Sequence, residues 1–283
     1  MFKQYSFNNI KSKHYLNPGE NLNDLDLMRL HNSLVSINQN AKAQVDNLYL
    51  RKNLKLSDLK EVYATCAITL IEDELSPFGF LISPIIKSEV GHIFHGGLII
   101  FNRNPGGDFM SLTALCNASM AYEKYGTLFA TNISSTPSII EVFTNTISQV
   151  WPSPKINLKV IPKDYKVVVQ ALKNQYMDKY FPENSNVIVD DKRFTMSSNS
   201  TEMGFSTDYY KLSRANKYIF QAFCKIWVNY EESEDIIQVG KVTFLTYLQQ
   251  KIKLEILKMK LKRVRPKSKI DLGVKEKKEQ RVA

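Results

Sequence analysis

The segment that most constrains the fold of this chain is His92–Gly126. It opens on an apolar run rich in β-forming residues, Gly97–Phe101, and then turns where Asn-Pro is followed by Gly-Gly. A helical pattern follows over Phe109–Lys124 and ends at Gly126, a residue that suits the left-handed position closing a helix. The first amides of such a helix lack partners and attract phosphate. Two interpretations stay open: a phosphate-binding turn, or an ordinary strand-to-helix connection with Asp108 as its N-cap.

The runs on either side of this unit predict a sheet. Three β-rich runs separated by short turns, Tyr63–Glu72, Phe78–Ile86 and His92–Phe101, are typical of an antiparallel meander. The next run, Thr127–Ile133, comes after the helix and is therefore expected to lie parallel to the strand before it. With a helical pattern over Leu25–Ile37, the chain is predicted to be α/β, of the α+β kind, with a mixed central sheet flanked by helices.

Less regular segments flank this predicted core. Residues 1–25 are polar and rich in Asn, so we expect an irregular N-terminal segment. Residues 156–250 are interpreted as a C-terminal extension, and 251–283 as the end of a basic helix followed by a disordered tail low in apolar residues. Val242–Leu261 has apolar residues at spacings of three and four, which predicts an amphipathic helix packed on its own domain.

The positive charge of the chain is concentrated at its end. The 283 residues carry a net charge of +10, and the segment Lys251–Ala283 has 13 Lys/Arg against 4 Asp/Glu, whereas the remainder has 25 against 24. The body therefore offers no electrostatic reason to expect nucleic acid. The tail has three open interpretations: a solvated disordered end, an arm that binds nucleic acid without sequence preference, or a peripheral contact with anionic membrane lipid.

Cysteine and histidine usage argues against disulfide and metal chemistry. Three widely spaced cysteines form no CxxC pair, so we expect small buried hydrophobes in a reducing, cytoplasmic compartment. His92 and His95 could share a metal, but no third ligand is indicated and no metal is expected. The N-terminus lacks the pattern of a secretory signal, and no run reaches the roughly 18 apolar residues of a membrane span, so we expect at most a peripheral association with a membrane.

The order of elements resembles the GCN5-related N-acetyltransferase (GNAT-like) superfamily. In that family the fourth strand runs into a loop of pattern Gln/Arg-x-x-Gly-x-Gly/Ala, whose amides hold the pyrophosphate of coenzyme A. The sequence RNPGGD matches this pattern at Arg103 and Gly106 and departs from it at Asp108, while Gly107 still allows close backbone approach. The resemblance covers roughly residues 26–155, which it implies to be a core that binds the acyl donor. It implies that Arg103, Gly106 and Gly107 bind the donor.

The resemblance also implies a reaction and candidate catalytic residues. In the family an amine attacks a thioester held between two central parallel strands, helped by a general base. His95, directly before Gly96-Gly97, is the favoured base, with Glu72 at the end of another strand in reserve. A structural histidine is an equally open interpretation of His95. Asn132, on the polar strand that follows the helix, is expected to contribute to donor binding.

The donor and the partners follow from the same resemblance. The donor would be a thioester of coenzyme A or of acyl carrier protein, because some GNAT-like enzymes, such as acyl-homoserine-lactone synthases and N-acyl amino acid synthases, use the carrier protein. An acidic carrier would be attracted to the basic helix at 251–265. The expected function is an acyltransferase acting on a small amine, whose acceptor side is shaped by the extension. The alternative is a non-catalytic binding protein on a decayed GNAT-like scaffold, contacting nucleic acid or anionic membrane through its basic tail.

Overall fold

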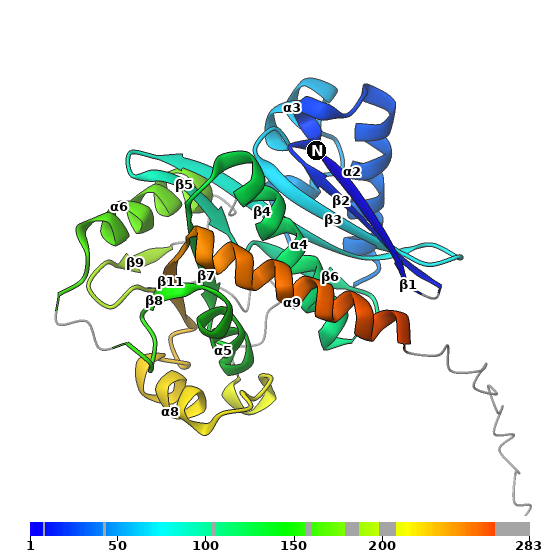
Figure 1. Ribbon diagram of the computed structural model, residues 1–283. Helices are drawn as coiled ribbons and strands as arrows, with labels where there is room; N and C mark the ends of the chain where they lie inside the picture. Colours follow the sequence, from blue (N-terminus) through cyan, green and yellow to red (C-terminus); the bar gives the residue numbers. More distant parts are fainter. Residues whose placement is uncertain are drawn as a thin grey trace, which may run out of the picture.

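The computed structural model describes residues 1–263 apart from six short gaps, at 8, 42–43, 104–105, 157–159, 179–186 and 198–207. The predicted disordered tail lies outside the described residues, as does the turn at 104–105. Within the described part, strands and helices form the mixed α/β architecture expected from the sequence, a large mixed sheet flanked by helices (Figure 1). No helix in the ranges just given is both long enough and apolar enough to cross a membrane.

The strands belong to one 11-stranded sheet with the order β1-β2-β3-β4-β5-β7-β11-β10-β9, in which β6 also pairs with β4 and β8 with β11. Their bounds are β1 Phe2–Phe7, β2 Ile10–Leu16, β3 Cys66–Glu72, β4 Pro77–Ser88, β5 Gly91–His95, β6 Leu98–Phe101, β7 Leu128–Ser134, β8 Ser148–Trp151, β9 Ile188–Asp190, β10 Thr195–Ser197 and β11 Glu234–Val242. Strands β3, β4 and β5 form the predicted antiparallel meander, and β7 lies parallel to β5, as predicted. Among the described strands, this is the one parallel pair.

The helices cover both faces of the sheet. Their bounds are α1 Pro18–Asn21, α2 Asp24–Gln39, α3 Leu56–Val62, α4 Gly107–Tyr125, α5 Pro137–Thr146, α6 Lys163–Leu172, α8 Tyr218–Trp227 and α9 Phe244–Arg263, with a π-helical turn η2 at Lys173–Met177. One face packs on α2, α3 and α6, and the opposite face on α4 and α9 (Figure 1). Strand β3 shows the alternation that makes this possible, because Ile68 and Leu70 point to the first core and Ala67 and Ile71 to the second.

The N-terminal segment is regular, which corrects the prediction for residues 1–25. It forms the β1–β2 hairpin, and β2 pairs along its length with β3, from Lys11 opposite Glu72 to Leu16 opposite Ala67. The alternation was hidden because two of the inward-facing residues of β2, Ser12 and His14, are polar, although both are fully buried. They are satisfied by hydrogen bonds to each other and to Thr69 of β3 and Asn117 of α4, as buried polar groups must be.

The predicted boundary between core and extension does not divide the fold. Strand β11 comes from the segment assigned to the extension, yet it lies between β7 and β10 and pairs with β7 from Ile236 opposite Ser134 to Val242 opposite Leu128. Its apolar run is interrupted by Gln238, which is buried and donates hydrogen bonds to Thr144 and to the carbonyl of Pro152. The segment 156–250 therefore completes the central sheet in addition to extending it.

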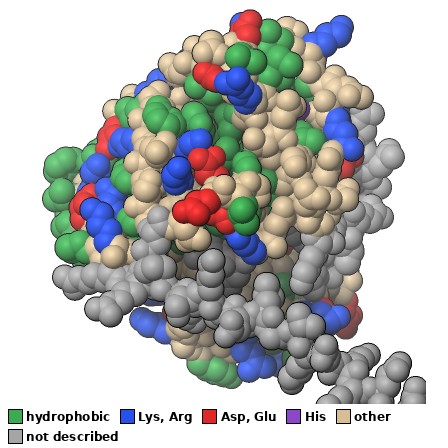
Figure 2. All heavy atoms as spheres, turned by 90° about the vertical axis from the view of Figure 1, so that its right-hand side faces the viewer, with side chains coloured by type: hydrophobic (Ala, Val, Ile, Leu, Met, Phe, Trp, Pro, Cys, Tyr) green, Lys and Arg blue, Asp and Glu red, His purple; other side chains and the backbone are tan. Residues whose placement is uncertain are grey.

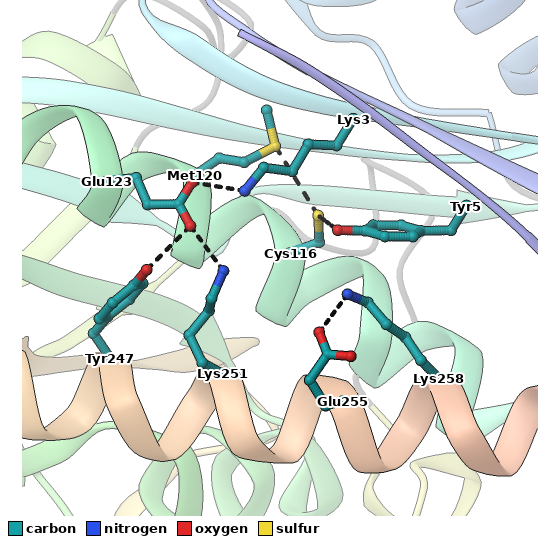
Figure 3. A network of polar contacts seen from close by, with 9 residues as sticks. All are labelled: Lys3, Tyr5, Cys116, Met120, Glu123, Tyr247, Lys251, Glu255 and Lys258. Carbon is teal, nitrogen blue, oxygen red and sulfur yellow. Dashed lines mark hydrogen bonds and ion pairs between the residues drawn. The ribbon is translucent and has the colours of Figure 1, made fainter.

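The helix predicted over Val242–Leu261 exists as α9, and it lies along α4 on the near side of Figure 1. Its orientation differs from the prediction. Val242, the first residue of the predicted apolar stripe, ends β11 and is buried, whereas the rest of the stripe, from Leu245 to Met259, is exposed. The residues of α9 that face the protein include Thr246, Gln250, Leu254 and Leu257. The network in Figure 3 holds the helix in place: Glu123 of α4 accepts hydrogen bonds from Lys3 of β1 and from Tyr247 and Lys251 of α9.

Candidate functional site

The central feature of the candidate site is the point where two parallel strands part. Strand β5 pairs with β7 at three positions, the last being His95 opposite Thr131. The amide of Gly96 then donates a hydrogen bond of 2.7 Å to the carbonyl of Thr131. Beyond it, β6 continues along β4 while the end of β7 continues along β11, and in the described chain no ladder joins β6 to β7. The two strands connected by α4 thus diverge beyond Gly96.

A bulge produces this divergence. Ile85 of β4 faces Phe94, and Ile82 faces Leu98, so two residues of β4 stand opposite three residues on the other strand. Gly97, in this bulge, has a φ of +45°, and a Cβ atom there would lie 1.8 Å from the carbonyl oxygen of Ile82. The position therefore requires glycine for its backbone conformation and for its close approach to β4.

His95, the predicted base, is inside the protein at this point. Its side chain is 3% exposed, its Nδ1 lies 3.0 Å from the hydroxyl of Thr131, and its ring packs on Tyr176 with centroids 4.6 Å apart. Burial lowers the pKa of His95 to about 3, so the imidazole is neutral at physiological pH. His92 faces the opposite side, as expected for a residue three positions earlier in a strand, and its ring packs at a tilt against that of Tyr125.

Asn132 lies beside the bulge. A Cβ atom on Gly96 would be 3.5 Å from its side-chain oxygen, and its side-chain nitrogen donates to Gln238 at 3.4 Å. His95 contacts Thr131, and Asn132 is the next residue of β7, so the side chains of His95 and Asn132 lie at the same end of the parallel ladder but on opposite faces of the sheet.

The start of α4 is open. The helix begins at Gly107 with Gly106 as its N-cap at a φ of +91°, and an added Cβ at either residue would meet none of the described atoms within 4 Å. This corrects the prediction that Asp108 is the N-cap. Asp108 lies in the first turn instead, 3.8 Å from the ammonium group of Lys260 on α9. The first amides of α4 and its positive dipole end remain suited to an anion, and the carboxylate of Asp108 opposes one there.

Arg103 is held by the β3–β4 hairpin. Its guanidinium forms an ion pair with Asp73 and lies 3.9 Å above the ring of Phe78. Although partial burial would raise the pKa of Asp73, hydrogen bonds from the Ser76 amide and from Arg103 hold that pKa below its usual value. Half of the Arg103 side chain is nevertheless exposed, so it can reach a ligand on its open side.

A hollow of about 530 Å³ adjoins Arg103, between the hairpin and α2. Its α2 wall consists of small polar residues, Asn32, Ser33, Ser36 and Asn40. The sequence analysis missed this wall. The signal was there in the spacing of Asn32, Ser36 and Asn40, because residues four apart on a helix lie on one face.

Glu72, the reserve base, lies away from the point where the strands part. It ends β3, faces Pro77 of β4 and forms an ion pair of 2.7 Å with Lys13. His95 lies near the other end of β4, because Phe94, the residue before it, pairs with Ile85. From Pro77, opposite Glu72, to Pro84, next to Ile85, the strand extends about 23 Å. The structure therefore does not bring the two predicted bases into one site.

In the part of the chain that the structure describes, neither the cysteines nor a metal site adds a candidate. All three cysteines, Cys66, Cys116 and Cys224, are free and buried, as predicted. Among the residues that the structure describes, no group of three or more His, Cys, Asp or Glu side chains could hold a metal ion.

We compared the sequence with protein families and with curated proteins. No protein-family model matches this chain, and a search of the curated proteins finds no match to its sequence. Its function must therefore be argued from the geometry above.

Proposed function

We propose that this protein is an acyltransferase that moves an acyl group from a thioester to an amine. The observation that carries the proposal is the parting of β5 and β7 beyond Gly96, at the end of a strand–helix–strand unit with an open helix start. Two parallel strands that diverge leave unpaired backbone edges facing each other. A thioester lying between them can hydrogen-bond to these edges with its amide and carbonyl groups.

The donor end of the site would be the start of α4. The open space at Gly106 and Gly107 lets a phosphate approach the first helical amides, as the GNAT-like resemblance implies. Arg103 adds a cation near this turn, although its ion pair with Asp73 reduces the charge it can offer. Coenzyme A and acyl carrier protein both present a phosphate and a thioester arm, and either is a suitable donor.

The proposed reaction is a single acyl transfer. The lone pair of the amine attacks the thioester carbonyl carbon, a C–N bond forms, and the C–S bond breaks. The proton lost by the amine ends on the thiolate that leaves, so the products are an amide and a thiol. A base helps when its pKa is near the working pH.

The assignment of His95 as that base stays a prediction, and its surroundings favour a second role. A ring with a pKa of about 3 takes up a proton poorly at neutral pH. The contact with Thr131 instead fixes the last paired position of β5 and β7. A positioning role predicts that His95→Gln lowers the rate without shifting its pH profile, whereas a base predicts loss of the ascending limb.

The direct test is a donor titration with matched glycine variants. Calorimetry with coenzyme A, acetyl-CoA, a medium-chain acyl-CoA and an acylated carrier protein measures binding, and release of free thiol in the presence of amines measures transfer. Gly106→Asp places a carboxylate at the start of α4 and should abolish donor binding. Gly91→Asp is the control, because Gly91 also has a positive φ and open space among the described residues but is the first residue of β5, opposite Ser88.

The outcomes separate the proposal from its alternative. Binding that is lost in Gly106→Asp and kept in Gly91→Asp supports an acyltransferase. Equal binding by both variants contradicts the assignment of the turn. A folded protein that binds none of the donors is a non-catalytic scaffold, an alternative that the burial of His95 and the Arg103–Asp73 pair favour. We also propose a cytoplasmic location, where both donors are found.

A further inference from the structure

Helix α9 is apolar on two opposite faces. The inward face carries Leu254 and Leu257 at the surface of α4. The outward face carries five aliphatic residues, which we call the α9 stripe: Leu245, Leu248, Ile252, Ile256 and Met259. Their exposed fractions are 63%, 44%, 58%, 45% and 51%, respectively. Single exposed apolar residues are normal on a protein surface, but a continuous row is typical of an interaction site.

The stripe is straight and long. Its members follow one another at spacings of three and four, which places them in a single row along a helix. From Leu245 to Met259 the row extends about 21 Å at 1.5 Å per residue. The helix lies across the near side of the molecule in Figure 1, and the row is exposed along its length.

Lysines border the stripe on both sides. At 100° per residue, Lys253 and Lys260 fall along one border, and Lys251, Lys258 and Lys262 along the other. Three of these lysines also form ion pairs within the protein: Lys251 with Glu123, Lys258 with Glu255 at 2.6 Å, and Lys260 with Asp108 at 3.8 Å. Lys/Arg and Asp/Glu side chains are intermingled on the face of the protein shown in Figure 2.

The helix is held so that the stripe cannot turn inward. Lys251 pairs with Glu123 of α4 at 2.9 Å, and Lys258 lies 4.4 Å from the ring of Tyr5 (Figure 3). Tyr247 stacks on Tyr122 of α4 with ring centroids 4.4 Å apart. These contacts all engage the side of α9 that faces α4 and β1, and they leave the stripe outward.

We propose that α9 docks the protein on an anionic membrane surface, with the stripe in the boundary between headgroups and acyl chains. A helix lying in the interface buries its apolar row about 5–10 Å deep while lysines on its flanks meet anionic headgroups. Lys253 and Lys262 have no ion pair among the described residues and contribute most of the attraction from α9, and the chain continues beyond α9 into a segment, 264–283, with 7 Lys/Arg and 3 Asp/Glu. The proposal does not depend on the acyltransferase activity.

The features of α9 favour lipid over other anionic or apolar partners. A second copy of the chain would bring the lysine borders of two stripes together, which like charges oppose. Nucleic acid would satisfy the lysines and leave the aliphatic row exposed to water. A protein partner would need a groove complementary to this row of side chains, whereas a bilayer accepts the row without one.

The experiment is sedimentation of the full chain with phosphatidylcholine vesicles, with and without roughly one third phosphatidylserine, at low and high salt. The test variant is Leu248→Gln/Ile252→Gln, which removes the centre of the stripe. The control is Leu75→Gln/Ile188→Gln, which removes two aliphatic residues that are 90% and 70% exposed elsewhere. Circular dichroism and thermal unfolding confirm that each variant is folded.

We expect binding to the anionic vesicles that weakens with salt, falls on the order of tenfold or more in the stripe variant and is unchanged in the control. Equal loss in both variants, or equal binding to neutral and anionic vesicles, would overturn the proposal. So would a dimer, seen by analytical ultracentrifugation, that the stripe variant converts to monomer. Binding to RNA or DNA but not to vesicles would assign the lysines to nucleic acid instead.

Discussion

Mild acid should destabilise this protein because it holds histidines that must stay neutral. His14 and His95 are 0% and 3% exposed, and burial lowers their pKa values to about 4 and about 3. In the unfolded chain both would titrate near their ordinary value of about 6.5. As the pH falls below that value the unfolded state gains protons that the folded state does not, so folding stability falls with pH until the folded-state pKa values are reached.

The size of the effect follows from these pKa values. Between pH 7 and pH 5, each histidine should remove about 2 kcal/mol of folding free energy, and the two together about 4 kcal/mol. Domains of this size are commonly stable by about 5–15 kcal/mol, so the loss is a large share. Burial also lowers the pKa of His31, which adds to the loss. Carboxylates with lowered pKa values, such as Glu123, contribute chiefly below this window.

Urea unfolding followed by circular dichroism between pH 7 and pH 5 measures the slope directly. The slope should approach two protons per molecule, and His14→Gln or His95→Gln should each remove about one proton from it, whatever its effect on stability at pH 7. His92→Gln is the control, because the ring of His92 is only partly buried. Stability that is flat across this range, or a slope that all three variants lower equally, would refute the assignment of neutral buried rings.

Two further predictions follow from the packing. Gly97→Ala should lower stability by about 3 kcal/mol or more in urea unfolding, because its Cβ would meet the carbonyl of Ile82, whereas Gly107→Ala, with open space among the described residues and no positive φ, should cost much less. A native sample should react slowly with a thiol reagent and release its full complement of thiols only on unfolding, because burial raises the pKa of Cys66, of Cys116 to about 11 and of Cys224 to about 12. Rapid reaction of any thiol in the folded protein would contradict the buried positions.

The middle of the fold could be predicted because its local signals agree. Between Cys66 and Ser134, each β-rich run is short and largely apolar. Glycine residues mark the turns before and after the helix α4. Strands β2 and β11 were missed because their inward positions include buried polar residues, His14 and Gln238, which read as solvent-facing. These two side chains can be buried because they form hydrogen bonds with residues distant in the chain, Asn117 and Thr144.

Some of the geometry around the candidate site follows from local sequence signals, and some does not. The two glycines Gly106 and Gly107 predict a turn by their residue type alone. Asn132 lies on β7, and the helix that connects β7 to the preceding strand predicts that the two strands are parallel. The burial of His95 depends on Tyr176, some eighty residues later, and the pairing of Arg103 depends on a hairpin thirty residues earlier. Contacts of that range leave no periodic trace in the sequence.

Helix α9 shows what periodicity alone can and cannot determine. The spacing of Leu248, Ile252 and Ile256 correctly predicts a helix with an apolar row, but the opposite side of the same helix carries Leu254 and Leu257 at equivalent spacing. Which row turns inward is decided by partners on other elements, above all the hydrogen bonds that Glu123 of α4 accepts from Lys251 and Tyr247. Since the inward row also buries Thr246 and Gln250 while the outward row is wholly aliphatic, the exposed row has the stronger tendency to leave water, and this imbalance is the physical reason to expect a partner for it.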